Sequence, residues 1–239
     1  MRQGGKMLAS VLQLVSKFLS PGMSSKELAD IAAQEIKTLG GRPSFLNHEN
    51  FPEVMCVSIN KELVHGLPSA KKIVKAGDVV GLDFGVIYKN MVVDGAVSLY
   101  VGDQPPADIK RLLSGTKEAL NSGIDAVSGD GTRVGDISAA VQKVLDKHRL
   151  GIIRDLVGHG VGDKVHEPPN IPNYGVAGTG VALSAGMTIA IEPMATLGDW
   201  HIKTGKDGFT VVTSDGSLAA HFEHTVLITD KAAEILTTS

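Results

Sequence analysis

The sequence predicts an α+β protein with internal pseudo-two-fold symmetry, in which a central antiparallel sheet is covered by two helix pairs. One observation is that a pair of amphipathic segments followed by short β-rich segments occurs twice along the 239 residues. The other is that no linker or low-complexity segment separates the two halves. We therefore expect a single domain over residues 1–239 rather than two independent modules.

The first helix pair is predicted from hydrophobic periodicity and from end signals. Apolar residues recur at helical spacing over residues 8–19, and Pro21-Gly22 ends the pattern. Ser24 and Glu27 have the spacing of a capping box, which begins a second helix that ends at Gly40-Gly41.

The segments that follow alternate between strand and helix patterns. Antiparallel strands are expected at residues 54–59, 79–88 and 91–101. Helical periodicity returns at residues 109–120 and 137–145, on either side of a Ser- and Gly-rich turn. The last expected strands cover residues 152–157, 187–193, 209–213 and 225–229.

Composition favours a globular protein in the reducing cytoplasm. Hydrophobic residues make up 43% and charged residues 21%, so neither disorder nor a membrane protein is indicated. A net charge of -3 without a Lys/Arg cluster argues against DNA as a partner. The single cysteine, Cys56, excludes an internal disulfide and a Cys-based zinc site. Residues 11–19 do not form a signal peptide, and no apolar run approaches the roughly 20 residues of a membrane helix.

Two aspartates interrupt apolar strands in the first half of the chain. Asp83 lies in Leu82-Asp83-Phe84, and Asp94 follows Val92-Val93. A tight turn at Lys89-Asn90 places Asp94 opposite Gly85, so the two carboxylates share one face of the sheet. A single such aspartate is better explained as a structural residue near a turn, but two on one face suit a pair of metal ions.

Four further residues in the second half are candidates for ligands or proton carriers. His159 lies between glycines, and His166 follows seven residues later. Glu192 ends an apolar strand immediately before a proline, and Glu223 enters an apolar segment between two histidines that could support it. Each of these residues alone is equally consistent with a structural or surface role.

Carboxylates with one imidazole suit hard or borderline divalent ions, and two such ions can generate hydroxide and polarise a carbonyl. Hydrolysis is therefore the leading reaction class. From these residues alone, a phosphoester substrate is as consistent with the site as a peptide substrate.

The order and contexts of Asp83, Asp94, His159, Glu192 and Glu223 resemble the metal ligands of the methionine aminopeptidases. The similarity extends over essentially the whole chain. It includes the segments Asn60-Lys61-Glu62-Leu63-Val64-His65-Gly66-Leu67-Pro68, Gly158-His159-Gly160-Val161-Gly162 and Ala190-Ile191-Glu192-Pro193-Met194. The absence of a zinc-finger extension and of a long insertion before the final strands favours the bacterial type I enzymes over type II.

The resemblance implies a pita-bread fold and a two-metal aminopeptidase that removes the initiator methionine when the next residue is small. The five ligands are expected to hold two divalent ions per subunit, of cobalt, manganese, iron, zinc or nickel, that share a bridging water or hydroxide. Glu192 is expected to relay a proton, His65 to contact the substrate, and His166 to hydrogen-bond the scissile carbonyl. The enzyme is expected to be a monomer that binds the N-terminal methionine of nascent polypeptides. The ribosome is a further candidate partner.

The resemblance also implies a pocket for the methionine side chain, and this chain departs from the family's pattern there and beside the metals. The pocket residues are expected to be Phe45, His48, Phe51, Cys56, Val165 and Phe209. His48 and Val165 stand where aromatics are common, which predicts a roomier or more polar pocket. Gly85 replaces a frequent hydroxyl residue, and Gly95-Ala96 replaces the usual pair after the second aspartate, so the family's metal preference and affinity are not carried over to this chain.

Two alternatives remain open at this point. A proline-directed peptidase such as aminopeptidase P or prolidase would use the same five ligands, although the segment around His65 and the lack of an N-terminal domain favour the methionine enzyme. A non-catalytic relative on the same scaffold is disfavoured because all five ligands are present. Fold alone does not separate these classes.

Overall fold

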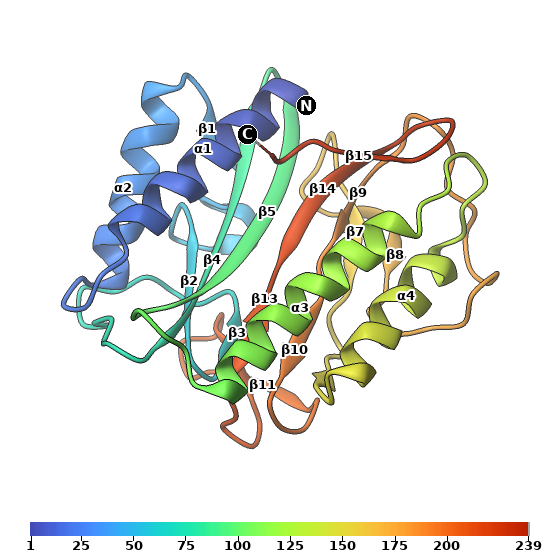
Figure 1. Ribbon diagram of the computed structural model, residues 1–239. Helices are drawn as coiled ribbons and strands as arrows, with labels where there is room; N and C mark the ends of the chain where they lie inside the picture. Colours follow the sequence, from blue (N-terminus) through green and yellow to red (C-terminus); the bar gives the residue numbers. More distant parts are fainter. Residues whose placement is uncertain (239) are drawn as a thin grey trace.

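Two helix pairs cover one large sheet in the computed structural model, which describes residues 1–238 (Figure 1). The predicted α+β class with two helix pairs is thereby confirmed. The helices are α1 (Arg2–Phe18), α2 (Ser25–Thr38), α3 (Ala107–Asp125) and α4 (Val134–Lys147), with a short 3-10 helix η1 (His48–Asn50).

The large sheet is antiparallel at every recorded pairing within the described residues. Its main path runs through β1 (Arg42–Pro43), β4 (Val79–Tyr88), β5 (Met91–Tyr100), β14 (Glu223–Ile228), β9 (Thr188–Ile191), β7 (Gly158–Gly160) and β8 (Glu167–Ile171). Off this path, β2 (Cys56–Ile59) pairs with β4 and β15 (Ala233–Ile235) pairs with β14. Two smaller sheets have the orders β13 (Ala219–His221), β10 (Met194–Thr196), β6 (Gly151–Ile152) and β11 (Ile202–Thr204), β12 (Val211–Thr213), β3 (Glu62–Val64).

The first helix pair packs on the half of the sheet formed by β4 and β5. The apolar face of α1 is buried against strand residues such as Leu82 and Phe84, which are fully covered. Helix α1 begins at Arg2, six residues before the predicted start. Hydrophobic periodicity did not indicate this first turn because it contains Gly5, a position with no room for a side chain beside the backbone carbonyl of Leu236. The predicted capping box of α2 is confirmed: Ser24 Oγ accepts from the Glu27 amide, and the Glu27 carboxylate accepts from the Ser24 amide.

The second helix pair packs on the half formed by β9 and β14 (Figure 1). Leu112 of α3 and Ile137 of α4 are fully buried in the same cluster as Ile189 and Val226 of these strands. The two clusters of apolar side chains, one under each helix pair, are the physical basis of the pseudo-symmetry expected from the sequence. Among residues 1–238, no helix combines the length and apolar character that a membrane crossing requires.

Several predicted strands differ from the observed ones. The strand predicted at 152–157 is wrong beyond Ile152, where the strand ends and the chain bends at Asp155. Just before this bend the Arg154 guanidinium lies over the rings of Tyr174 and Trp200. The strand predicted at 187–193 is two strands, β9 and β10, interrupted at Glu192-Pro193. The break occurs where proline cannot donate to the ladder.

Candidate active site

The β4–β5 hairpin brings Asp83 and Asp94 to neighbouring positions. Its turn consists of Lys89 and Asn90, whose φ angles of 49° and 62° are the positive values that a tight two-residue hairpin needs. The register pairs Gly85 with Asp94, which confirms the pairing predicted from the sequence.

Both aspartates lie on the sheet face that points away from the helices. Successive side chains on a strand point to opposite faces. Leu82 and Phe84 pack beneath the first helix pair, so Asp83 between them points the other way. Val93 packs in the same cluster, and Asp94 therefore also points away from the helices.

Glu223, the first residue of β14, lies in line with this pair. Ala96 of β5 is paired with Asp83 on one side and with Glu223 on the other, so both acids stand on one row across three strands. Asp94 and Glu223 are buried, with 4% and 3% of their surfaces exposed. Such acids are expensive to bury unless a cation or hydrogen bond compensates.

His159 lies on strand β7 and not in the glycine loop suggested by its neighbours. It is paired with Ala190 of β9, and a side chain on Gly158 would collide with the carbonyl of that same residue, so glycine permits the strand to form. His159 Nδ1 is 2.9 Å from the carbonyl oxygen of Gly160, which can only accept, so Nδ1 carries a proton. The other ring nitrogen, Nε2, is directed at the acids and lies 3.3 Å from Glu192 Oε1.

Glu192 lies in the break between β9 and β10, where the sequence predicted a strand end. Its second oxygen, Oε2, is 3.4 Å from His221 Nε2. His221 also lies 3.8 Å from Glu223, so it supports two of the acids at once. The sequence suggested that both histidines beside Glu223 could do this. His224, however, is hydrogen-bonded to Thr237 instead, with its Nδ1 2.8 Å from the threonine hydroxyl.

The donor atoms of this cluster fit divalent cations. One ligand atom each of Asp94, His159 and Glu223 lie within 4.8 Å of one another. Asp83 Oδ1 and Glu223 Oε1 are buried and have no hydrogen-bond partner among the described residues. Unpartnered buried carboxylate oxygens are costly, and cations would satisfy them.

The pKa values of the acids reflect this crowding in the metal-free protein. Burial and the neighbouring charges of Asp94 and Glu192 raise the pKa of Asp83 well above its ordinary value. Burial, together with the charges of Asp94 and Glu192, does the same to the pKa of Glu223. Burial also raises the pKa of Asp94 to about 6, although His159 opposes the shift. Bound cations would favour the ionised form of all three.

Glu192 and His159 form an ion pair within the cluster. Burial opposes ionisation of Glu192, but the adjacent imidazoles of His159 and His221 outweigh it and hold its pKa at about 2. Burial likewise opposes protonation of His159, but the hydrogen bond and charge of Glu192 raise its pKa to about 9. Glu192 is therefore ionised at neutral pH.

A cavity of about 510 Å³ contains these groups. Every candidate residue from the sequence lines it: Phe45, His48, Phe51, Cys56, His65, Asp83, Asp94, His159, Val165, His166, Glu192, Phe209 and Glu223. Sequence reasoning missed several other lining residues, including Glu49, Asp155 and Asn170. Nothing in their local sequence distinguishes them from ordinary surface residues.

His65 and His166 reach the cavity from two different loops. Partial desolvation lowers the pKa of His65, and desolvation with the adjacent His159 lowers the pKa of His166 to about 4. The His166 ring packs edge-on against His159, with ring centroids 4.4 Å apart. Both His65 and His166 are therefore neutral imidazoles at neutral pH, each with one N–H donor.

Five of the six residues expected for the methionine pocket form an apolar wall. Phe45, Phe51, Cys56 and Val165 share a buried cluster, and Phe209 packs against it with its ring edge-on to Phe51. Burial and the charges of Asp83 and Asp94 raise the pKa of the Cys56 thiol well above its ordinary value, so it stays protonated and acts as a small apolar group. The sixth residue, His48, is outside this cluster and faces His166.

Ser44 accounts for the glycine at position 85. A side chain on Gly85 would coincide with Ser44 Oγ and would press on the Phe45 ring. Ser44 Oγ is buried without a hydrogen-bond partner among the described residues. The space that a side chain at position 85 would need is thus filled by a hydroxyl from a different segment of the chain.

Residues 1–230 match the profile of metallopeptidase family M24. The methionine aminopeptidase of Aquifex aeolicus is 42% identical over 244 aligned positions, which cover 99% of this chain and 94% of the relative.

Solved structures agree with this similarity. The crystal structure of methionine aminopeptidase from Thermotoga maritima is 43% identical, with a TM-score of 0.97, and the match covers 100% of this chain and 95% of that one. Prolidase from Pyrococcus furiosus has a TM-score of 0.79 at 22% identity, with 100% of this chain and 62% of that one covered. The second likeness concerns the fold alone, and together they confirm the pita-bread arrangement.

Proposed function

Because the chain belongs to metallopeptidase family M24 and, within it, to the methionine aminopeptidases, we propose that its cavity hydrolyses the first peptide bond of chains that begin with methionine. The activity is that of a metal-dependent aminopeptidase. The observation that carries the residue assignments is the convergence of Asp83, Asp94, His159, Glu192 and Glu223 in one cavity with an apolar wall.

We assign two divalent cations to those five residues. Buried oxygens of Asp83 and Glu223 without partners, and the row of acids across three strands, support the assignment. Divalent cations held there would lower the pKa of water and polarise a carbonyl group. Manganese, iron, cobalt, zinc and nickel all suit oxygen ligands with one imidazole, so the choice among them is left to measurement.

Glu192 has the protonation state that a proton acceptor requires. Its carboxylate is ionised at neutral pH because the His159 and His221 imidazoles lie 3.3 and 3.4 Å from its oxygens and lower its pKa. It can therefore take a proton from the attacking water at an Oε atom and pass that proton to the amine that leaves.

His166 and His65 supply neutral N–H donors on the cavity wall. We assign His166 to the carbonyl oxygen of the bond that breaks, where a donor stabilises the negative charge that develops. We assign His65 to the substrate backbone beside it. The low pKa of each imidazole keeps it neutral, so neither competes with the cations for the acids.

The apolar wall of Phe45, Phe51, Cys56, Val165 and Phe209 is the proposed slot for the methionine side chain. An unbranched thioether adapts to an irregular apolar slot, and aromatic rings make favourable contacts with its sulfur. We further propose that residues 1–239 form one catalytic domain and that the protein is a monomer in the cytoplasm. Its substrates would be nascent polypeptides in which the residue after the initiator methionine is small. Docking on the ribosome belongs to the same proposal.

The test is peptide cleavage by metal-free protein reconstituted with manganese, iron or cobalt. Met-Gly-Met-Met should release methionine, a peptide with a large second residue should react slowly, and an X-Pro peptide should remain intact. Cleavage of the X-Pro peptide would assign a prolidase activity instead. No turnover with any cation would leave only a binding role for the cavity.

A further inference from the structure

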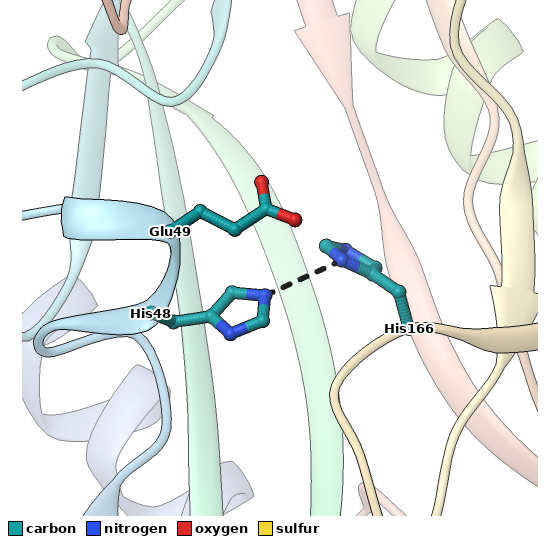
Figure 2. Close-up of side chains that lie close together, drawn as sticks. All are labelled: His48, Glu49 and His166. Carbon is teal, nitrogen blue, oxygen red and sulfur yellow. Dashed lines mark hydrogen bonds between the residues drawn. The ribbon is translucent and has the colours of Figure 1, made fainter.

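A second group of side chains that could bind a metal lies on the wall of the same cavity, apart from the four acids and one imidazole already assigned. His48 and Glu49 come from η1, and His166 comes from the loop between β7 and β8. Figure 2 shows both imidazole rings and the Glu49 carboxylate directed toward a common point. One ligand atom from each residue lies within 4.8 Å of the other two.

The spacing of the two imidazoles suits a shared cation better than a direct hydrogen bond. His48 Nε2 and His166 Nδ1 are 3.5 Å apart, which is longer than the usual range for a nitrogen donor. Two nitrogens at about 2.0–2.1 Å from a tetrahedral zinc ion are separated by about 3.3–3.4 Å. The observed separation is therefore within a few tenths of an ångström of the value that ligation requires.

The loop holds the two adjacent ligands on the same side. Neighbouring residues of an extended chain point in opposite directions, but Asn47, Glu49 and Asn50 all have positive φ angles, of 66°, 47° and 65°. Backbone hydrogen bonds fix this turn, from the Asn47 amide to the Phe51 carbonyl and from the Phe51 amide to the His48 carbonyl. The ligands are thus presented by a braced turn and need little rearrangement.

We propose that His48, Glu49 and His166 bind a divalent transition-metal ion of the zinc class, in addition to the two cations assigned to the buried acids. Two imidazole nitrogens and one carboxylate oxygen form a borderline donor set that prefers such ions to magnesium or calcium. Three protein ligands leave one tetrahedral position for water or a substrate atom. Because His48 is half-buried and the other two residues are exposed, the ion would exchange directly with solvent.

Ligation would also fix the state of the His166 ring. With Nδ1 bound to the ion, the ring proton must stay on Nε2, which remains available as a donor. This consequence for catalysis rests on the role proposed above for His166. The binding site itself does not depend on that role.

The experiment counts bound zinc in chelated and refilled full-length protein by equilibrium dialysis with elemental analysis. Wild type is compared with His48→Ala, Glu49→Gln and the control Glu118→Gln. The control has the same substitution in another His–Glu pair, since Glu118 Oε2 lies 2.7 Å from His148 Nε2 outside the cavity. Urea unfolding of each variant verifies that it is folded.

We expect His48→Ala and Glu49→Gln each to bind one zinc ion fewer than wild type, and Glu118→Gln to bind as many as wild type. The difference in bound zinc between wild type and a cavity variant reports this site alone. If the assignment of two cations to the buried acids is wrong, the total number of bound ions changes but this difference does not. Equal binding by wild type and both cavity variants would overturn the proposal. A loss in His48→Ala alone would overturn the three-residue site, and a loss in the control would show that the ion binds elsewhere.

Discussion

The metal-free protein should become less stable as the pH rises from 5 to 8, because Asp94 is buried among other acids. Its pKa in the folded protein is about 6, against 3.8 in the unfolded chain. A raised folded pKa means that the folded state binds the proton more tightly. The associated stability is complete below the unfolded pKa and is lost as the pH rises through the folded one.

The magnitude follows from the proton that the folded state retains. Between pH 5 and about 6 the folded Asp94 is largely protonated while the unfolded one is already ionised, and this difference corresponds to a stability on the order of 1 kcal/mol. His159 acts in the same direction, because its pKa of about 9 lies above the ordinary value of 6.5. The low pKa of Glu192, about 2, contributes stability that is lost only as the pH falls below the unfolded value of 4.5. Glu192 therefore does not affect the pH dependence between pH 5 and 8.

The assay is urea unfolding followed by circular dichroism at several pH values in excess chelator. Wild type should lose stability from pH 5 to 8, and Asp94→Asn, which does not titrate, should lose less over that range, by on the order of 1 kcal/mol. Added manganese should flatten the wild-type dependence, because a cation favours the ionised acids. Identical pH dependences for wild type and Asp94→Asn, or a metal-free stability that rises from pH 5 to 8, would refute the reasoning.

Three further substitutions test the proposed roles of His166 and Phe209 and the packing around Gly85. His166→Ala should lower kcat for methionyl peptides by roughly 100-fold in steady-state assays with little change in urea midpoint; a loss below about tenfold contradicts its role. Phe209→Ala should raise KM for Met-Gly peptides by roughly tenfold, and an unchanged KM places the side chain elsewhere. Gly85→Thr should lower the free energy of unfolding by about 1–3 kcal/mol, because the new side chain collides with Ser44 Oγ. Adding Ser44→Gly should restore part of this loss. If the effects of the two substitutions simply add, the collision is not the cause.

The hairpin that carries Asp83 and Asp94 was predictable because its determinants are local. Lys89-Asn90 marks the turn, and the alternation of side chains along a strand then decides which residues share a face. Glu192 was likewise placed at a strand end by the proline that follows it.

The features that sequence reasoning missed depend on contacts between distant segments. His159 lies on a strand although both neighbours are glycines, because β8 and β9 supply the ladder and leave no room for side chains. Ser44 fills the space beside Gly85 from another segment, and the glycine itself was the available signal. Glu49 joins the cavity through a turn of positive φ angles that glutamate rarely adopts, so no propensity indicates it.

The most direct test of the account is to titrate metal-free protein with manganese while measuring bound metal and released methionine in the same samples. We predict that methionine release from Met-Gly-Met-Met is absent without metal, rises with occupancy of the site formed by Asp83, Asp94, His159, Glu192 and Glu223, and is lost in Glu223→Gln. Methionine release that persists in excess chelator, or that is undiminished in Glu223→Gln, would contradict the assignment of these residues as the catalytic metal site.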